Sequence, residues 1–327
     1  MLQAGAGGVV AILLGPRLYR ADPDIFGPVH ILLVVAVLVI APLALALAAS
    51  PGPDGEHPLV HRAAIVVLPF AGAAATASFL FPAGRTAALV AAPWALFALL
   101  AAAFGLVRFY RRKGARFRLG DLCIDVGLVY LPVGARWLLL SRAGIEPPRV
   151  PEPIVVLTAV HFHYTFFTAT LLTGLLGKRI AAAGSVLARR VFTLAALGVL
   201  AGPALVATGI NTAVPLVEVA GAVLLAVSLA TSAVLTVAVA ARRTVGARAE
   251  WLLSIGSLAV GGGMVAAIVF GVGKYCSIPT LEIPEMIRLH GLANALYAVS
   301  CLLGWHAARS VAPASAGPTV AREVDSH

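Results

Sequence analysis

The sequence predicts an all-α fold, a polytopic bundle of about nine transmembrane helices, and two observations indicate it. Hydrophobic residues make up 60% of the 327 residues, charged residues only 12%, and the mean hydropathy is +0.97. This is more apolar surface than one water-soluble core buries. The apolar residues also fall in runs of about 20, the length with which an α-helix crosses a bilayer. Within a range of eight to ten spans, the predicted ones are residues 28–49, 63–83, 86–108, 118–141, 153–176, 190–212, 216–241, 251–273 and 285–307.

The segments on either side of this bundle, which covers residues 28–307, differ from it. Residues 1–27 contain an apolar stretch, Ala4 to Leu14, that is too short to span alone and has no basic residue before it. We expect an interfacial helix there rather than a signal peptide, with a tenth helix of the bundle as the alternative. Residues 308–327, rich in Ala, Pro and Ser, predict a disordered cytoplasmic tail.

Basic residues predict the orientation, because short loops rich in Lys and Arg stay in the cytoplasm. With nine spans, one side collects Arg62, Arg108, Arg111, Arg112, Lys113, Arg116, Arg118, Lys178, Arg179, Arg189, Arg190, Arg242, Arg243, Arg248, Arg309 and Arg322. The other side holds only Arg17, Arg20, Arg85, Arg142, Arg149, Lys274 and Arg288. The N-terminus is therefore predicted outside and the C-terminus inside. The net charge of +10 follows from this topology and from anionic lipid headgroups, without a nucleic-acid partner.

The composition also bears on the source of the chain and on its covalent chemistry. Arg far outnumbers Lys, and Ala and Gly are abundant, which favours a GC-rich bacterial genome and hence the bacterial inner membrane. The three cysteines, Cys123, Cys276 and Cys301, lack the paired spacing of a zinc site or a disulfide framework. No internal repeat is found, which weakens the case for a transporter built from inverted halves. Nothing specifies an oligomeric state.

The segment His161-Phe162-His163-Tyr164 places two imidazoles and a phenol at hydrocarbon depth in the predicted fifth span. Ionisable groups at this depth usually mark a functional site. On an α-helix His161 shares a face with Tyr164 and Thr168, whereas His163, two residues on, points about 200° away. The two histidines therefore cannot chelate one metal from the same face. We expect one to serve a site and the other to brace a neighbouring helix.

The ninth span carries a second polar stripe. His290, Asn294 and Tyr297 follow the i, i+4, i+7 spacing of one helical face. Two interpretations remain open: hydrogen bonding that joins helices, which is common in membrane bundles, and a stripe that lines a polar cavity.

Glu218 lies three residues after Pro215, at the predicted outer start of the seventh span. It either complements the helix N-terminus or, partly buried and protonated, donates a proton to a substrate. Asn211, in the connection just before it, would supply an amide to the same cavity.

The fourth span contains Asp121, Asp125 and Arg136, whose separations of 4 and 11 residues predict one shared face. Asp121 fits a carboxylate at the helix N-terminus, and Asp125, one turn deeper, is a second candidate acid. Arg136 would reach the headgroups, bind an anionic group, or pair with Glu218 or Glu285 across the bundle.

Three stretches resemble the YndJ-like membrane proteins over roughly residues 120–307. They are Tyr-Leu-Pro-Val-Gly-Ala-Arg-Trp-Leu-Leu-Leu-Ser-Arg-Ala-Gly from Tyr130, Leu-Thr-Ala-Val-His-Phe-His-Tyr from Leu157, and His-Gly-Leu-Ala-Asn from His290. The resemblance implies a polytopic helical bundle and no particular reaction. The positions it implies as a polar centre are His161, His163, Tyr164, His290 and Asn294. Arg136 beside Trp137, and Tyr297, depart from the family pattern.

The first functional hypothesis is an acid–base enzyme acting on a lipophilic isoprenoid, most concretely a terpene cyclase that protonates an epoxide or alkene. Glu218 or Asp125 would be the acid, and His161 or His290 the base. Aromatic faces would stabilise the carbocation, and neither a cofactor nor a metal is needed. The expected substrate-binding residues are His163, Tyr164, Arg136, Asn211, Asn294, Tyr297, Phe162, Phe166 and Trp137, with Phe167 as a further aromatic face.

The second hypothesis is a membrane protein that binds or transports a ligand. His161 or His163 would ligate a haem iron together with His290, or the polar centre would pass a small solute or a proton. A third possibility is a polar centre that only fixes the packing of the bundle. The cost of burying several ionisable groups argues against this third reading.

Overall fold

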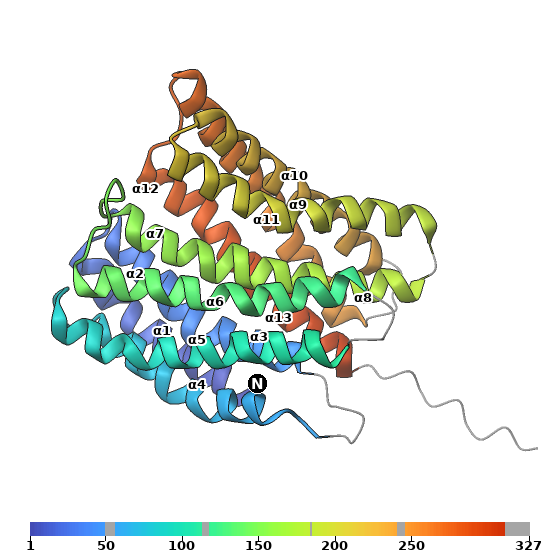
Figure 1. Ribbon diagram of the computed structural model, residues 1–327, viewed down its shortest axis with the longest axis horizontal. Coiled ribbons are helices and arrows are strands. Elements are labelled where there is room, and N and C mark those ends of the chain that lie inside the picture. Colours follow the sequence, from blue (N-terminus) through green and yellow to red (C-terminus); the bar gives the residue numbers. More distant parts are fainter. Residues whose placement is uncertain (50–55, 113–117, 184, 241–245, 311–327) are drawn as a thin grey trace, which may run out of the picture.

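A computed structural model describes residues 1–49, 56–112, 118–183, 185–240 and 246–310. Within these ranges the chain is helical and forms no strand, and nine helical segments are long and apolar enough to cross a membrane. The predicted fold class is therefore confirmed (Figure 1). The elements are α1 (Leu2–Ala21), α2 (Phe26–Val35), η1 (Ala36–Ile40), α3 (Ala41–Ala48), α4 (Leu59–Ser78), α5 (Arg85–Arg111), α6 (Leu119–Ala143), α7 (Ile154–His161), η2 (Phe162–Ala169), α8 (Thr170–Ala183), α9 (Val186–Thr212), α10 (Pro215–Ala240), α11 (Ala247–Cys276), α12 (Ile283–Met286), η3 (Ile287–Gly291) and α13 (Leu292–Ser310).

Most predicted span boundaries lie within about four residues of the helix ends. The fifth span was predicted to end at residue 176, whereas its last helix α8 continues to Ala183, and the second span was predicted to continue to residue 83. Its helix α4 ends at Ser78, whose hydroxyl donates to the Ala75 carbonyl over 2.6 Å. The backbone then tightens into turns that end before Pro82, and Arg142 of α6 donates to the carbonyls of Ser78 and Phe81. Hydropathy does not detect this stop, because the residues after Ser78 remain apolar.

Helix α1 packs lengthwise against the first span. Gly7 lies against Leu38 of η1, and Gly27 at the start of α2 lies against Leu18, so the two segments are antiparallel. Asp22 accepts backbone N–H groups in the turn between them. Helix α1 contacts the first span but is not among the nine segments of the described residues that are long and apolar enough to cross a membrane, so the interfacial helix and the tenth helix both stay predictions. The placement of α1 relative to a bilayer, and of the N-terminus outside, stay predictions.

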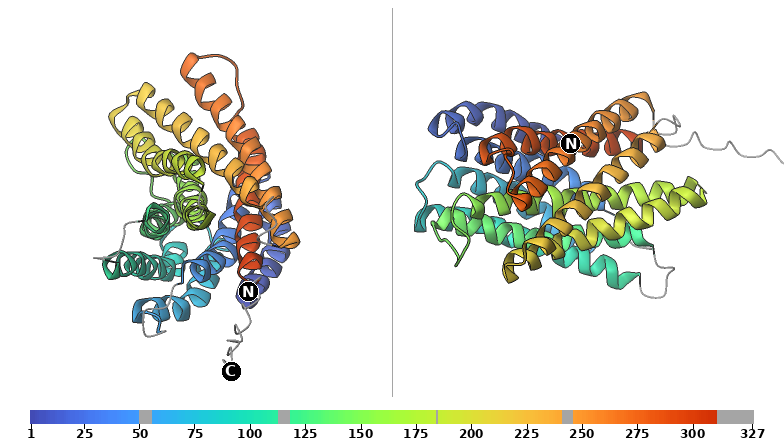
Figure 2. Two further views of the ribbon diagram at one scale, coloured as in Figure 1. Left: turned by 90° about the vertical axis from the view of Figure 1, so that its right-hand side faces the viewer. Right: turned by 90° about the horizontal axis from the view of Figure 1, so that it is seen from above.

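The long helices run along a common direction, with α11 and α13 inclined across α6 and α8 (Figure 1). In the end view of Figure 2, α4 and α5 (blue to cyan) lie on one side of the green helices α6 and α8, and α9 and α10 (yellow) on the other. The first and fifth spans are the most buried. Close approach of α6 and α8 depends on Gly120 and Gly174, each of which faces the other's backbone, as small residues do between membrane helices.

Three spans contain a π-helical segment: η1 in the first, η2 in the fifth and η3 in the ninth. A π turn adds one residue to the helical hydrogen-bonded ring and is frequent at functional sites. Of the polar residues that the sequence singles out, His163 and Tyr164 lie in η2 and His290 lies in η3. The predicted tail, residues 308–327, lies outside the described residues from residue 311 onward.

Candidate functional site

His163 is held inside the bundle by hydrogen bonds at both ring nitrogens. Trp94 of α5 donates its Nε1–H to Nε2 over 3.0 Å, and Nδ1 lies 2.7 Å from the Ala159 carbonyl. A carbonyl only accepts, so Nδ1 carries the hydrogen and the imidazole is neutral. His163 is 1% exposed. It braces α5 against η2, as expected for one of the two histidines, and neither nitrogen is free for a ligand.

His161 has the opposite character. Its side chain is exposed, and its Nδ1 donates to the Leu157 carbonyl one turn back over 2.8 Å. This bond puts the lone pair on Nε2, which has no hydrogen-bond partner among the described residues. The ring of His290 faces it, with centroids 6.1 Å apart and planes at 26°. The fifth and ninth spans therefore meet at a histidine pair.

His290 is the fixed member of this pair. Its Nδ1 donates to the Gly263 carbonyl of α11 over 2.9 Å, and the Asn294 side-chain amide lies 3.0 Å from its Nε2. The same amide also donates to the His290 carbonyl over 2.8 Å. Two residues of the predicted polar stripe, His290 and Asn294, thus bond each other, and His290 also joins α11 to the ninth span. We call His161, His290 and Asn294 the histidine centre.

The π turn of η2 changes the face that α-helical spacing predicted. Thr168 donates to the His163 carbonyl five residues back, and Tyr164 donates to the Leu32 carbonyl of α2 over 2.8 Å. Both side chains are buried whereas His161 is exposed. The prediction that His161, Tyr164 and Thr168 share a face is therefore wrong, because the wider turn rotates the residues after it.

The aromatic residues expected around one substrate lie in separate places. Phe162 and Phe166 pack edge to face at 4.4 Å and contact Tyr130 of α6. Trp137 packs against the core beside the Arg136 guanidinium. Tyr297 is 7% exposed in α13, and its hydroxyl bonds no described residue. Phe167, named for the same role, is buried in the core.

Glu218 and Asn211 lie at the hairpin between α9 and α10. Glu218 is half-buried against Gly209, and its carboxylate makes no hydrogen bond or ion pair with a described residue. Asn211 is exposed and its amide donates to the Ala207 carbonyl over 2.8 Å. No interaction joins either residue to the histidine centre within the described part of the chain.

Asp125 belongs to a buried ionic group at the predicted cytoplasmic end. Its carboxylate accepts from Arg108 Nε over 2.8 Å and also pairs with Arg112. Asp121, in the first turn of α6, lies 3.2 Å from Lys178 and 3.7 Å from Arg108. We call Arg108, Arg112, Asp121, Asp125 and Lys178 the ionic cluster. Both carboxylate oxygens of Asp125 are engaged by guanidinium groups, which leaves neither oxygen free to face a substrate, so Asp125 does not fit the role of proton donor.

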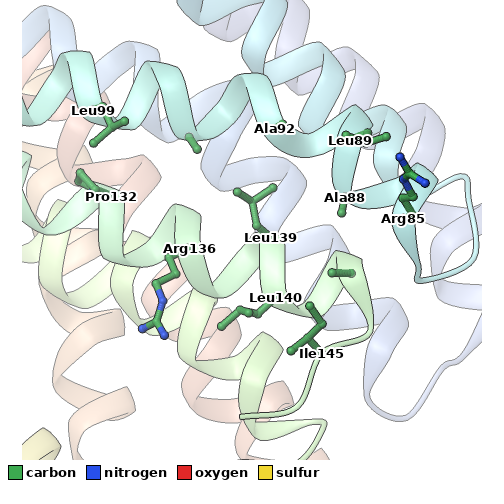
Figure 3. A pocket seen from close by; sticks show the side chains of 12 residues that line it. Arg85, Ala88, Leu89, Ala92, Leu99, Pro132, Arg136, Leu139, Leu140 and Ile145 are labelled. Carbon is green, nitrogen blue, oxygen red and sulfur yellow. The ribbon is translucent and has the colours of Figure 1, made fainter.

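Arg136 does not share the buried face of Asp121 and Asp125. Its side chain is exposed, and none of the expected partners reaches it, since Glu285 accepts the Glu282 backbone N–H in a capping box before η3. Figure 3 shows Arg136 on α6 beside an apolar groove that α5 and α6 form. The prediction that Asp121, Asp125 and Arg136 share one face is therefore wrong, because α6 packs against different helices at its two ends.

Sequence reasoning missed a second histidine pair, His57 and His61, at the start of α4. The rings lie 4.7 Å apart, and His61 packs on Phe104. Nδ1 of His57 and both nitrogens of His61 are buried without a hydrogen-bond partner in the described residues. The separation of four residues between His57 and His61 was the sequence pattern that could have predicted this pair. No group of three or more metal-ligating side chains forms among the described residues.

The described residues form nine helical segments that are long and apolar enough to cross a membrane, with a polar centre between the fifth and ninth, which defines a polytopic membrane protein. Comparisons with known proteins agree. The family described as YndJ-like protein matches residues 31–298, and the chain belongs to this family. It is 27% identical over 213 residues to the uncharacterized membrane protein YndJ of Bacillus subtilis strain 168. The match covers 65% of this chain and 37% of that protein. No solved structure matches the chain.

Proposed function

We propose that this protein is an integral membrane binding or transport protein whose histidine centre takes up a proton. The observation that carries the proposal is the unpartnered Nε2 lone pair of His161, exposed and opposite His290. A neutral imidazole with a free lone pair is the side chain best suited to exchange a proton near neutral pH.

The surroundings of His161 support reversible uptake rather than permanent charge. No acidic group forms an ion pair with either histidine in the described residues. The neighbouring His290 has the hydrogen bonds of a neutral imidazole, since its Nδ1 donates to the Gly263 carbonyl and its Nε2 accepts from the Asn294 amide. A proton added to His161 would therefore be stabilised by hydrogen bonds and ring contact alone, and would leave again easily.

Histidine-selective ¹⁵N NMR of the protein in nanodiscs tests this proposal. Between about pH 8 and about pH 5, the Nε2 signal of His161 is expected to move reversibly from the neutral to the protonated position. Signals are assigned with His161→Gln, His163→Gln and His290→Gln variants. His163 is the internal control, because Trp94 already occupies its Nε2. A His161 signal unchanged across this range would remove the histidine centre as a proton site.

Transport, as distinct from binding, is tested in liposomes that contain a pH-sensitive dye. We expect a pH step to equilibrate through the wild-type protein and to slow in His161→Gln. His306→Gln is the matched control, because His306 bonds the Leu43 carbonyl away from the centre. Titration in the NMR experiment without flux in liposomes would reduce the proposal to proton binding.

A second candidate is the acid–base enzyme on a lipophilic isoprenoid, most concretely a terpene cyclase. His161 supports it as a base, and Glu218 as an acid without a partner among the described residues. We place the enzyme second because no interaction joins Glu218 to the histidine centre among the described residues. Membranes are assayed with linear prenyl and epoxy-prenyl compounds against a Glu218→Gln control. A product of unchanged mass that vanishes in the control would favour the enzyme.

Haem ligation has less support. His163 has no free nitrogen, and His290 would have to lose its contact with the Asn294 amide to bind iron. A Soret band in the purified protein would instead favour haem ligation.

We further propose the bacterial inner membrane as the location, with the C-terminus in the cytoplasm, since the charge distribution of the connections supports it.

A further inference from the structure

The groove between α5 and α6 joins a long apolar surface to two cationic side chains. It has a volume of about 620 Å³, within the roughly 300–1,000 Å³ of ligand sites in proteins. The lining is almost entirely aliphatic: Ala88, Leu89, Ala92, Ala95, Leu99, Pro132, Leu139, Leu140, Ala143 and Ile145, with Arg85 and Arg136. The small residues on α5 and Pro132 on α6 leave the space open.

The two arginines lie at different depths along the groove. Arg85 is the first residue of α5, and Figure 3 shows it at one end of the groove, beside the connection from α4. Arg136 lies seven residues before the end of α6 at Ala143, which is about 10 Å into the span at 1.5 Å per residue. Pro132 and Leu99 mark the opposite end, so the groove extends from the charged end into apolar depth.

Neither guanidinium has an acidic partner among the described residues. Both side chains are exposed. Among the described residues the Arg136 guanidinium contacts only the ring of the neighbouring Trp137, whose centroid is 5.7 Å from Cζ. A permanently charged group inside a span and on the bilayer side is unfavourable unless an anion or headgroup compensates it. Guanidinium groups bind phosphate through paired hydrogen bonds.

We propose that this groove binds a phospholipid with an anionic headgroup. Arg85, at the charged end of the groove, binds the phosphate, and Arg136, farther along, adds a second positive charge that favours an anionic lipid. One acyl chain lies along the alanine and leucine residues toward Leu99 and Pro132. The two positive charges favour an anionic headgroup, and the aliphatic lining of the groove favours the acyl chain of a lipid. This site is separate from the histidine centre, with which it shares no residue.

Native mass spectrometry tests the proposal on the full chain released from detergent with phosphatidylglycerol or phosphatidylcholine at equal concentration. The wild type is expected to retain phosphatidylglycerol preferentially. Arg85→Gln and Arg136→Gln should each reduce this retention about fivefold. Arg288→Gln is the matched control, because Arg288 is also exposed at the predicted outer side but lies in η3.

A steric variant separates groove binding from general attraction to a basic surface. Ala92→Phe fills the groove without a change of charge and should also reduce retention, whereas Leu258→Phe on the exposed surface of α11 should not. Size-exclusion profiles and helical circular dichroism confirm that each variant is folded. Equal retention of both lipids by the wild type would overturn the proposal. Loss in the arginine variants but not in Ala92→Phe would also overturn it.

Discussion

The ionic cluster and the histidine centre are both polar groups within an apolar bundle, and they differ in how completely their atoms are paired. In the cluster, Asp125 is held by two arginines, and Asp121 by a lysine and an arginine. In the centre, His290 is paired at both nitrogens and His161 at one. Full pairing of buried polar atoms indicates a structural role, whereas an open lone pair leaves a position for a ligand.

The largest expected effect comes from Asp125→Asn. The variant removes the charge that compensates buried Arg108, and breaking a buried ion pair typically costs about 3–5 kcal/mol of unfolding free energy. Thermal unfolding in detergent measures it. Lys178→Gln is the control, because the Lys178 side chain is 40% exposed and such pairs contribute about 1 kcal/mol or less. Similar losses in both variants would contradict the distinction between buried and exposed pairs.

Trp94→Phe should have the next largest effect. It leaves Nε2 of His163 buried without a donor, which typically costs about 1–3 kcal/mol. The same unfolding measurement applies, with Trp251→Phe as the control, since Trp251 is 71% exposed on α11. If His163 is a structural brace, the ¹⁵N titration of His161 should survive in Trp94→Phe. Its disappearance would mean that the two histidines act together.

Tyr164→Phe should cost about 1 kcal/mol, the usual net contribution of one hydrogen bond. The variant removes the bond from the Tyr164 hydroxyl to the Leu32 carbonyl, which joins η2 to α2. Tyr275→Phe provides the comparison, because Tyr275 is 46% exposed at the end of α11. An equal effect in both variants would show that this bond does not stabilise the fold.

His161→Gln should change stability least, within about 0.5 kcal/mol, as is usual for exposed positions. Its effect should fall on proton uptake instead. The comparison between cluster and centre is sharpest here, since a position that is neutral for folding and essential for exchange has a functional role. A large loss of stability in His161→Gln would place His161 with the structural residues.

The spans were predictable because hydropathy is a local property of the chain. The failures occurred where position depends on partners distant in sequence. The second span ends five residues early because Arg142 binds the carbonyls that follow α4. The face shared by His161 and Tyr164 was wrong because η2 is a π-helix, and the 3.6-residue rule does not apply within it.

Sequence alone determined that the chain is a bundle of membrane-spanning helices. Continuous apolar runs of about 20 residues form spanning helices, whereas the strands of a membrane β-barrel alternate apolar and polar residues. It also determined which residues are too polar for their depth. Only the tertiary structure decided their roles. His163 and His161 are two residues apart, yet Trp94, 69 residues away, occupies one and leaves the other open. The physical reason is that hydropathy belongs to a residue, whereas a free lone pair depends on every side chain that packs around it.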